Sequence, residues 1–257
     1  MEIEGKVALV TGGAKRVGRS IALALAERGG EVVLHYHGSE REAQEALALI
    51  KRAGGKPVAV QGDVSMAVDV DRIVETAMQA FGRIEILVNN AAIFARTPFG
   101  ELTEGDWDRF LDVNLKGPFL MCRKVGAIML QQAQGKIVNL ADIGAQKVWA
   151  DYIPYSVSKA GVLALTIGLA KALAPHVQVN AIAPGAVLLP EGTRAEEQEQ
   201  AIRRVPLKRL GSPEDIARAV LFLVENDFIT GEVLRVDGGQ HLILPIEDGQ
   251  STTDNQP

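Results

Sequence analysis

Short apolar runs alternate along the chain with longer segments in which apolar residues recur every three or four positions. Continuous runs rich in valine, isoleucine and leucine are typical of strands buried on both faces of a sheet. We predict strands at residues 6–12, 31–36, 56–64, 84–91, 136–142, 177–185 and 231–239. We predict helices at residues 17–28, 39–55, 65–81, 104–134, 155–175 and 212–226. This alternation predicts an α/β protein with a single-domain Rossmann fold, a doubly wound parallel sheet with helices on both faces.

Two segments do not follow the alternation. Residues 186–205 are polar and follow the strand at 177–185, whose carboxyl end is expected to face a ligand site. They form either a mobile lid or a passive surface insertion. Residues 246–257 are mostly polar and predict a disordered tail, so the folded domain is expected to span residues 1–245.

One predicted helix carries both a start and a stop signal. Ser39 is followed three residues later by Glu42, which is the spacing of a capping box. Two glycines end the segment at 54–55, where a helix terminus is expected.

The net charge, the single cysteine and the lack of a long apolar run exclude several kinds of partner and site. The 257 residues carry a net charge of -5, and the basic residues are scattered, so nucleic acid is not expected as a partner. The single cysteine, Cys122, excludes an internal disulfide and a cysteine-based metal site, and no metal is expected. The chain has no run of about eighteen apolar residues and no signal region at its start, so we expect a cytoplasmic protein without a membrane partner.

A glycine-rich stretch, VTGGAKRVG at residues 10–18, joins the first strand to the first helix. Small residues there allow the backbone to approach a pyrophosphate, and the amino end of a helix favours its negative charge. We therefore expect a dinucleotide to contact Gly12, Lys15, Arg16 and Val17. A simple tight turn is the alternative interpretation.

The end of the second strand indicates which dinucleotide is bound. An acid is usual about twenty residues past the glycine loop, where it holds the ribose 2′-hydroxyl. Here the stretch contains Tyr36, His37 and Ser39 and no acid. Because Lys15 and Arg16 add positive charge nearby, these positions favour NADPH as cofactor.

Two further strands end in polar residues that are expected to lie along the same crevice. Asp63 and Val64 follow the third strand, and the Asp63 carboxylate can accept a hydrogen bond from an adenine amino group. Asn90 and Ala91 follow the fourth strand, where asparagine amides can hold neighbouring loops together. His35 lies inside an apolar strand and is expected to be a packed core residue.

Tyr155 and Lys159 are four residues apart on a predicted helix, so their side chains lie one above the other. A phenol with a pKa of about 10 is a poor acid at neutral pH. A neighbouring ammonium favours the phenolate, so we expect Lys159 to lower the pKa of Tyr155. The tyrosine can then donate a proton as a hydride arrives on the neighbouring atom.

The order of these motifs resembles the short-chain dehydrogenase/reductase family. The resemblance covers about residues 5–240 and includes the glycine loop, Asn114 in DVNLKGPF, and APG at 183–185. It implies that Asn114, Tyr155 and Lys159 are catalytic and that the protein is a homotetramer. It also implies cofactor contacts from Tyr155, Lys159, Pro184 and Gly185.

Several positions depart from the usual family pattern. Arg16 replaces the middle glycine of the loop, Ala92 replaces the glycine of NNAG, and Asp142 replaces a serine thirteen residues before the tyrosine. With LHYHGS at 34–39 and with Phe94, these positions resemble the pteridine reductases. That resemblance implies that Arg16 holds cofactor and pterin, that Phe94 stacks on the pterin, and that Asp142, Tyr155 and Lys159 perform the chemistry. Phe94 as a simple loop anchor is the alternative.

Asp142 decides which substrate the sequence favours. A serine donates a hydrogen bond to a carbonyl oxygen, whereas an ionised aspartate only accepts one. A pterin offers ring N–H and amino groups, so a carboxylate suits it, and the sequence favours NADPH-dependent pterin reduction. The alternatives are reduction of a ketone or 3-oxoacyl thioester, an NADPH-sensing module without turnover, and an Asp142 that only caps local backbone.

Overall fold

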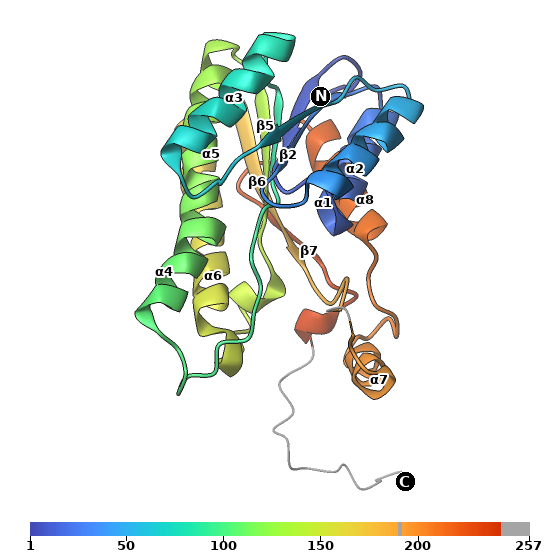
Figure 1. The fold of residues 1–257 in the computed structure, drawn as a ribbon, viewed down its shortest axis with the longest axis vertical. Coiled ribbons are helices and arrows are strands. Elements are labelled where there is room, and N and C mark those ends of the chain that lie inside the picture. Colours follow the sequence, from blue (N-terminus) through green and yellow to red (C-terminus); the bar gives the residue numbers. More distant parts are fainter. Residues whose placement is uncertain (190–191, 243–257) are drawn as a thin grey trace, which may run out of the picture.

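The computed structural model describes residues 1–189 and 192–242. Within them, seven strands form one sheet in the order β3-β2-β1-β4-β5-β6-β7 (Figure 1). Every neighbouring pair is parallel. The strands are β1 (Val7–Val10), β2 (Glu31–Tyr36), β3 (Val58–Gln61), β4 (Ile86–Asn89), β5 (Gly135–Leu140), β6 (Val177–Pro184) and β7 (Val233–Val236). The predicted doubly wound α/β fold is confirmed.

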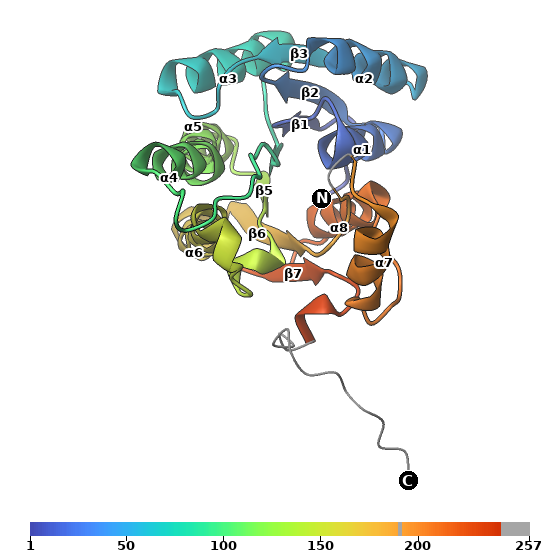
Figure 2. The same ribbon diagram turned by 60° about the horizontal axis from the view of Figure 1, so that its bottom comes forward.

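Helices cover both faces of the sheet (Figure 2). One face carries α1 (Arg16–Glu27), α2 (Glu40–Arg52) and α8 (Pro213–Glu225). The other carries α3 (Ala67–Phe81), α4 (Glu104–Leu111), α5 (Gly117–Gln131) and α6 (Ile153–Leu173). Ala8 and Val10 belong to one hydrophobic cluster, whereas Val7 and Leu9 belong to the other. Because alternate residues of a strand face opposite sides, each side contributes one core layer.

The strand order reverses between β1 and β4, because the chain moves outward through β2 and β3 and then returns to the other side of β1. Ligands bind outside the carboxyl ends of strands at such a reversal. The loops after β1, β2, β3 and β4 therefore surround one crevice, which is where the sequence placed the cofactor.

The predicted helix at 104–134 is continuous but not uniform. Residues Asp112–Lys116 form a π-helical stretch between α4 and α5, and Asn114 lies inside it. A π-turn widens the helix by one residue, and such turns are frequent at functional sites. Residue periodicity did not reveal it, because the apolar spacing on either side remains helical.

One local prediction was wrong, and one helix was not predicted. Ser39 precedes α2 but makes no side-chain capping bond, so the predicted capping box with Glu42 does not form. The polar segment 186–205 contains the unpredicted helix α7 (Ala195–Arg203), and the lid and the surface insertion both remain predictions for this segment. The end of the predicted domain at residue 245 and the predicted tail at 246–257 lie outside the described residues.

Helix α6 is the most apolar long helix of the described chain. A window within Ala150–Leu173 has a mean hydropathy of 1.4, which by length and composition alone would fit a membrane span. The helix instead lies along the sheet beside β6 (Figure 2). It also carries the side chain of Lys159, which is buried. Helix α6 therefore packs on the sheet as part of the folded domain.

Candidate active site

The glycine-rich loop between β1 and α1 requires glycine at two positions. Gly12 has a φ of +62°, and a Cβ atom there would lie 3.0 Å from the Ala91 Cα. A Cβ atom on Gly18 would lie 2.1 Å from the Gly12 carbonyl oxygen. The absence of side chains brings the loop backbone to the cavity surface, so the loop fits a phosphate-binding turn.

Hydrogen bonds of the Thr11 and Asn90 side chains join this loop to the end of β4. The Thr11 Oγ1 accepts hydrogen bonds from the backbone N–H groups of Asn90 (2.9 Å) and Ala91 (3.0 Å). The Asn90 Nδ2 donates to the carbonyl oxygens of Thr11 (2.9 Å) and Gly12 (3.1 Å). The prediction that an asparagine amide holds neighbouring loops together is confirmed.

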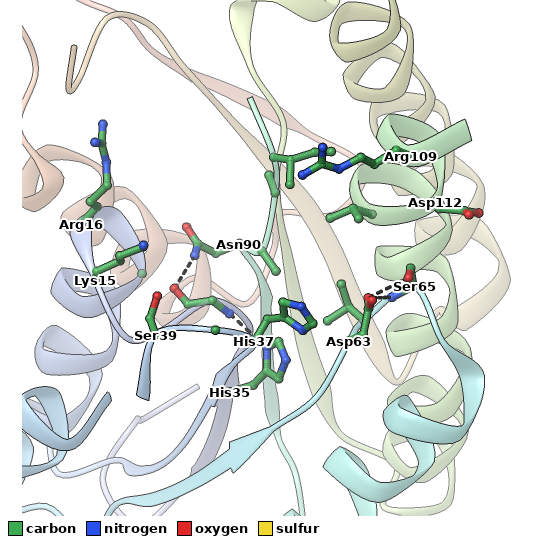
Figure 3. A pocket seen from close by; sticks show the side chains of 18 of the residues that line it. Lys15, Arg16, His35, His37, Ser39, Asp63, Ser65, Asn90, Arg109 and Asp112 are labelled. Atoms are coloured by element: carbon green, nitrogen blue, oxygen red, sulfur yellow. Dashed lines mark hydrogen bonds between the residues drawn. The ribbon is translucent and has the colours of Figure 1, made fainter. Parts of the chain in front are cut away.

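A cavity of about 750 Å³ opens at these loop ends (Figure 3). Ten of the predicted cofactor-binding residues line it: Gly12, Lys15, Arg16, Val17, His37, Ser39, Asp63, Val64, Asn90 and Ala91. The Ser39 hydroxyl, which makes no capping bond, therefore lies where a ligand can reach it. The cavity is thus lined by the cationic side chains of Lys15 and Arg16 and by the hydroxyl group of Ser39, all of which can bind a phosphate group.

The other predicted cofactor residues lie outside this lining. The Tyr36 side chain packs in the hydrophobic core and is 8% exposed. Pro184 ends β6, and a Cβ atom on Gly185 would lie 2.7 Å from the Asp237 Cβ. Tyr155 and Lys159 belong to α6. Cofactor contacts from these five residues remain predictions.

Arg16 combines an unusual backbone with a long-range contact. Its φ is +52°, a left-handed value that is uncommon for a residue with a side chain. Its Nη2 donates to the Leu188 carbonyl oxygen at 3.3 Å, in the loop that follows β6. Arg16 therefore connects the glycine loop to the loop that follows β6.

Arg109 is a lining residue that the sequence did not single out. It belongs to α4, and its guanidinium group points into the cavity from the side opposite Lys15 (Figure 3). An exposed arginine on a surface helix has no spacing or motif that distinguishes it from a solvated one. Only the packing of α4 beside the crevice reveals it.

Asp63 is held at the edge of the cavity by Ser65. The Asp63 Oδ1 accepts hydrogen bonds from the Ser65 backbone N–H (2.8 Å) and hydroxyl (2.7 Å). Burial acts to raise the pKa of Asp63, but these hydrogen bonds outweigh it and the pKa is lowered. The residue is thus an ionised acceptor, as contact with an amino group requires.

Asp142 and Tyr155 are in direct contact. The Tyr155 hydroxyl donates to the Asp142 Oδ2 at 2.8 Å, and the Asp142 Oδ1 accepts from the Gly144 backbone N–H at 2.7 Å. The carboxylate therefore both caps local backbone and contacts the tyrosine, which joins two interpretations that the sequence left separate. Burial raises the pKa of Asp142.

The predicted lowering of the Tyr155 pKa was wrong for this structure. Burial, followed by the charge and hydrogen bond of Asp142, raises the pKa of Tyr155 well above its ordinary value. The Lys159 Nζ lies 5.9 Å from the Tyr155 ring centroid and donates to the Leu140 carbonyl oxygen at 2.7 Å. Burial lowers the pKa of Lys159 to about 8. Tyr155 is thus a protonated phenol that holds its proton more tightly than an exposed tyrosine does.

Asn114 connects the cavity wall to the helix that carries Tyr155. Its Oδ1 accepts from the Ile93 backbone N–H at 2.8 Å, and its Nδ2 donates to the Ile93 carbonyl oxygen at 3.0 Å. The same Nδ2 donates to the Ser158 hydroxyl at 3.2 Å. Ile93 itself lines the cavity. The geometry makes Asn114 a positioning residue, and its predicted catalytic role remains a prediction.

Phe94 lies against two tyrosines. Its ring stacks on Tyr152, with centroids 4.8 Å apart and planes 6° apart, and meets Tyr155 edge to face at 4.8 Å. Half of Phe94 nevertheless remains exposed. The Phe94 ring thus packs against two tyrosines while half of the residue stays exposed, so both the anchoring and the substrate-binding interpretations remain open.

Known proteins resemble this chain over nearly its whole length. A family model described as enoyl-(acyl carrier protein) reductase matches residues 12–241. A 3-oxoacyl-[acyl-carrier-protein] reductase of Synechocystis is 38% identical over 92% of this chain and 97% of its own length. The reductase of the same name from Staphylococcus epidermidis is 37% identical over 92% of this chain and 99% of its own length.

The solved structures agree with the sequences. A putative short-chain alcohol dehydrogenase from Sinorhizobium meliloti superposes with a TM-score of 0.88. It is 33% identical to this chain, and the match covers 94% of this chain and 99% of the other. Fold and sequence therefore indicate the same family, and neither of the two reductases reported above is named for a pterin.

Proposed function

This chain belongs to the short-chain dehydrogenase/reductase family of nicotinamide-dependent oxidoreductases, and we propose that it reduces the carbonyl group of a 3-oxoacyl thioester with NADPH. The observation that carries the proposal is the buried Tyr155 hydroxyl, which is held by Asp142 one helical turn from Lys159. A bound NADPH supplies the hydride, and Tyr155 supplies the proton to the carbonyl oxygen.

The residues present fit a phosphorylated dinucleotide. Gly12 and Gly18 leave the loop backbone bare where a side chain would collide, so the loop can approach a pyrophosphate. Asp63 offers an ionised acceptor for an adenine amino group. The cavity thus provides a surface for the phosphates and a partner for the base.

The charges that line the cavity favour a dinucleotide with a 2′-phosphate, which is NADPH. No acid stands at His37, Gly38 or Ser39, where one would repel a phosphate, and all three residues line the cavity. Lys15 and Arg16 line it from the glycine loop. Each charge-assisted hydrogen bond to a phosphate is worth about 1.5–3 kcal/mol, so NADPH should bind more tightly than NADH.

The names of the relatives favour a 3-oxoacyl substrate over a pterin, and Asp142 can be reconciled with that substrate. Its pKa is raised by burial, so its carboxyl group takes up a proton more readily than an exposed aspartate does. A neutral carboxyl group donates a hydrogen bond. It then gives the carbonyl oxygen the same kind of contact that a serine hydroxyl gives.

Pterin reduction is the second candidate, and Asp142 is again the observation that favours it. The ionised carboxylate is an acceptor that matches the N–H and amino groups of a pterin. The half-exposed ring of Phe94 beside Tyr155 adds a flat apolar surface. Both candidates use the same tyrosine proton, so only the substrate distinguishes them.

The test is a substrate panel followed through NADPH absorbance. Acetoacetyl thioesters, dihydropterins and simple diketones are compared at equal concentration, each with NADPH and with NADH. We expect the thioester to give the highest kcat/KM. Higher kcat/KM for a dihydropterin would transfer the proposal to the second candidate, and turnover of no substrate would contradict both. Tyr155→Phe, which lacks the proton, is the control for the assay.

The assembly and location extend the proposal. Exposed apolar side chains lie on α5 (Phe119, Leu130) and on α6 (Val157, Ile167). Apolar residues on two neighbouring helices suit burial against a second copy of the chain. We propose a homotetramer in the cytoplasm, with residues 1–245 as its single domain.

A further inference from the structure

We propose that His35 is a positioning residue of the cofactor site, because its imidazole ties the first turn of the glycine-rich loop to the end of β3. The proposal rests on the use of a nicotinamide dinucleotide, which the family implies, and does not depend on the substrate. It assigns a function to a side chain whose sequence context predicted only packing.

The ring of His35 bridges two backbone groups of opposite kind. Its Nδ1 accepts a hydrogen bond from the Gly12 backbone N–H at 3.2 Å, and its Nε2 lies 3.0 Å from the Gly62 carbonyl oxygen. Because a backbone N–H can only donate, Nδ1 carries no proton. The proton is therefore on Nε2, which donates to Gly62, and the ring is neutral.

Burial favours the same neutral form. His35 is 1% exposed, and burial lowers its pKa, with the Gly62 hydrogen bond acting in the opposite direction. A second ring proton would point at the Gly12 N–H and break that contact. The backbone of His35 adds a further link, because its carbonyl oxygen accepts from the Gly13 N–H at 2.9 Å.

The two segments joined by His35 are walls of the same cavity (Figure 3). Gly12 lines it from the glycine loop with a φ that only glycine adopts freely. Gly62 directly precedes Asp63, which lines it from the end of β3. One ring thus sets the spacing between the loop expected at the pyrophosphate and the acid expected at the adenine.

A purely structural role would have different consequences. Val33 is a buried neighbour two residues earlier in the same strand, on the same face of the sheet as His35, and its side chain only packs. Loss of its methyl groups weakens the strand without changing any hydrogen bond to the glycine loop. Val33→Ala is therefore a matched control for lost stability.

Three substitutions separate the two hydrogen bonds. His35→Asn keeps an acceptor near the position of Nδ1, His35→Gln keeps a donor near the position of Nε2, and His35→Leu keeps neither. Dissociation constants for NADPH and NADH are measured by titration of the full chain, alongside the melting temperature and the steady-state KM and kcat.

We expect all three His35 variants to raise both dissociation constants about threefold to tenfold, the range of one lost hydrogen bond, because each variant breaks at least one arm of the bridge. His35→Leu, which keeps neither hydrogen bond, should weaken binding at least as much as His35→Asn or His35→Gln. In these variants the KM for the dinucleotide should rise more than kcat falls. Val33→Ala should lower the melting temperature and leave the dissociation constants unchanged.

Several outcomes would overturn the proposal. If the dissociation constants of all three His35 variants are unchanged, His35 is a packed core residue and does not position the cofactor site. A loss of affinity in only one of His35→Asn and His35→Gln would show that a single hydrogen bond, and not the bridge, positions the site. Weakening of equal size in Val33→Ala would assign the effect to general stability. If His35→Leu does not fold, the comparison of the Asn and Gln variants still decides.

Discussion

The hydroxyl of Tyr155 donates a hydrogen bond to the Asp142 Oδ2 across 2.8 Å. The proton that a reduction would require is therefore already engaged with a neighbouring group on the protein. Burial, together with this contact, raises the pKa of Tyr155 and so keeps the phenol protonated. Asp142 thus controls the state of the proton donor whichever substrate is reduced.

Asp142→Asn should move the alkaline limb of the pH profile. Lys159 has a pKa of about 8, which burial lowers and the Asp142 charge raises. Its ammonium form is present below that pH and is lost above it, so activity should fall as the pH rises through about 8. Removing the negative charge lowers the pKa of Lys159 further, and the limb should shift to lower pH. The measurement is kcat against pH.

Lys159→Arg is the matched variant for this assignment. A guanidinium group stays charged throughout the range, because its pKa is above about 12. Its residual activity should show no decline near pH 8. An alkaline limb at the same pH in the parent and in both variants would mean that another group is responsible.

Gly38→Asp should shift the cofactor preference toward NADH. Gly38 lines the cavity, and a Cβ atom there meets no atom within 4 Å, so a side chain fits. A carboxylate at this place repels a 2′-phosphate and accepts from a 2′-hydroxyl instead. We expect the ratio of kcat/KM for NADPH to that for NADH to fall at least tenfold, or about 1.4 kcal/mol. Gly38→Asn, which lacks the charge, should fall much less, and equal ratios in both variants would rule out repulsion.

Phe94→Ala should raise the KM for the substrate more than the KM for NADPH. Phe94 is half exposed beside Tyr155, and stacking of a flat substrate ring on it would be worth about 0.5–1.5 kcal/mol beyond the buried area. We expect a rise of up to roughly tenfold in substrate KM. Phe99→Ala is the control, because Phe99 lies in the same segment and is 78% exposed. A lower melting temperature with an unchanged substrate KM would assign Phe94 to anchoring Tyr152.

Much of the fold could be predicted because the apolar pattern is strong. Strand β2 begins and ends at the predicted residues 31 and 36, since every residue from Val32 to Tyr36 is buried. Helix α7 was missed because its residues are polar and none of them is buried, so no apolar stripe marks it. Periodicity reports burial against a core, and it says nothing about a helix that lacks one.

Motif spacing predicted ten of the residues that line the cavity, but it predicted neither Arg109 nor the electrostatics of Tyr155. The spacing of the motif predicted that Tyr155 and Lys159 lie side by side on one helix, and both residues belong to α6. The sign of the Tyr155 pKa shift was wrong, because burial and the direction of a hydroxyl proton depend on tertiary packing. The hydrogen bond from Gly12 to His35 was invisible for the same reason, since 23 residues separate the partners.

Ile167→Asp should convert the protein to smaller species. Ile167 is 45% exposed on α6, in a helix whose other exposed apolar residues include Val157. A carboxylate buried at an interface between copies is strongly unfavourable. We expect the parent to sediment as a tetramer at micromolar concentration and the variant as a monomer or dimer. Val68→Asp on α3 should remain a tetramer, and a monomeric parent would contradict the proposed assembly.

Asp142→Ser is the change that distinguishes the two candidate substrates. A serine keeps a short side chain that can still accept from the Gly144 N–H, so the local turn should survive. It also places a neutral hydroxyl donor next to Tyr155. Asp142→Ala, which can neither cap the turn nor donate, is the control for structural damage.

We expect Asp142→Ser to increase the reduction of acetoacetyl thioesters about threefold to tenfold, the range of one hydrogen bond. The reason is that a hydroxyl always has a proton to donate to the growing negative charge, whereas the carboxyl group of Asp142 donates only when it is protonated. Pterin reduction by the same variant should fall about 10²–10⁴-fold if the carboxylate assists that reaction as an acid or base. Thioester turnover that falls in Asp142→Ser as far as in Asp142→Ala would show that the carboxyl group itself serves carbonyl reduction. A parent that turns over only the pterin, and loses this activity in Asp142→Ser, would establish the second candidate through Asp142.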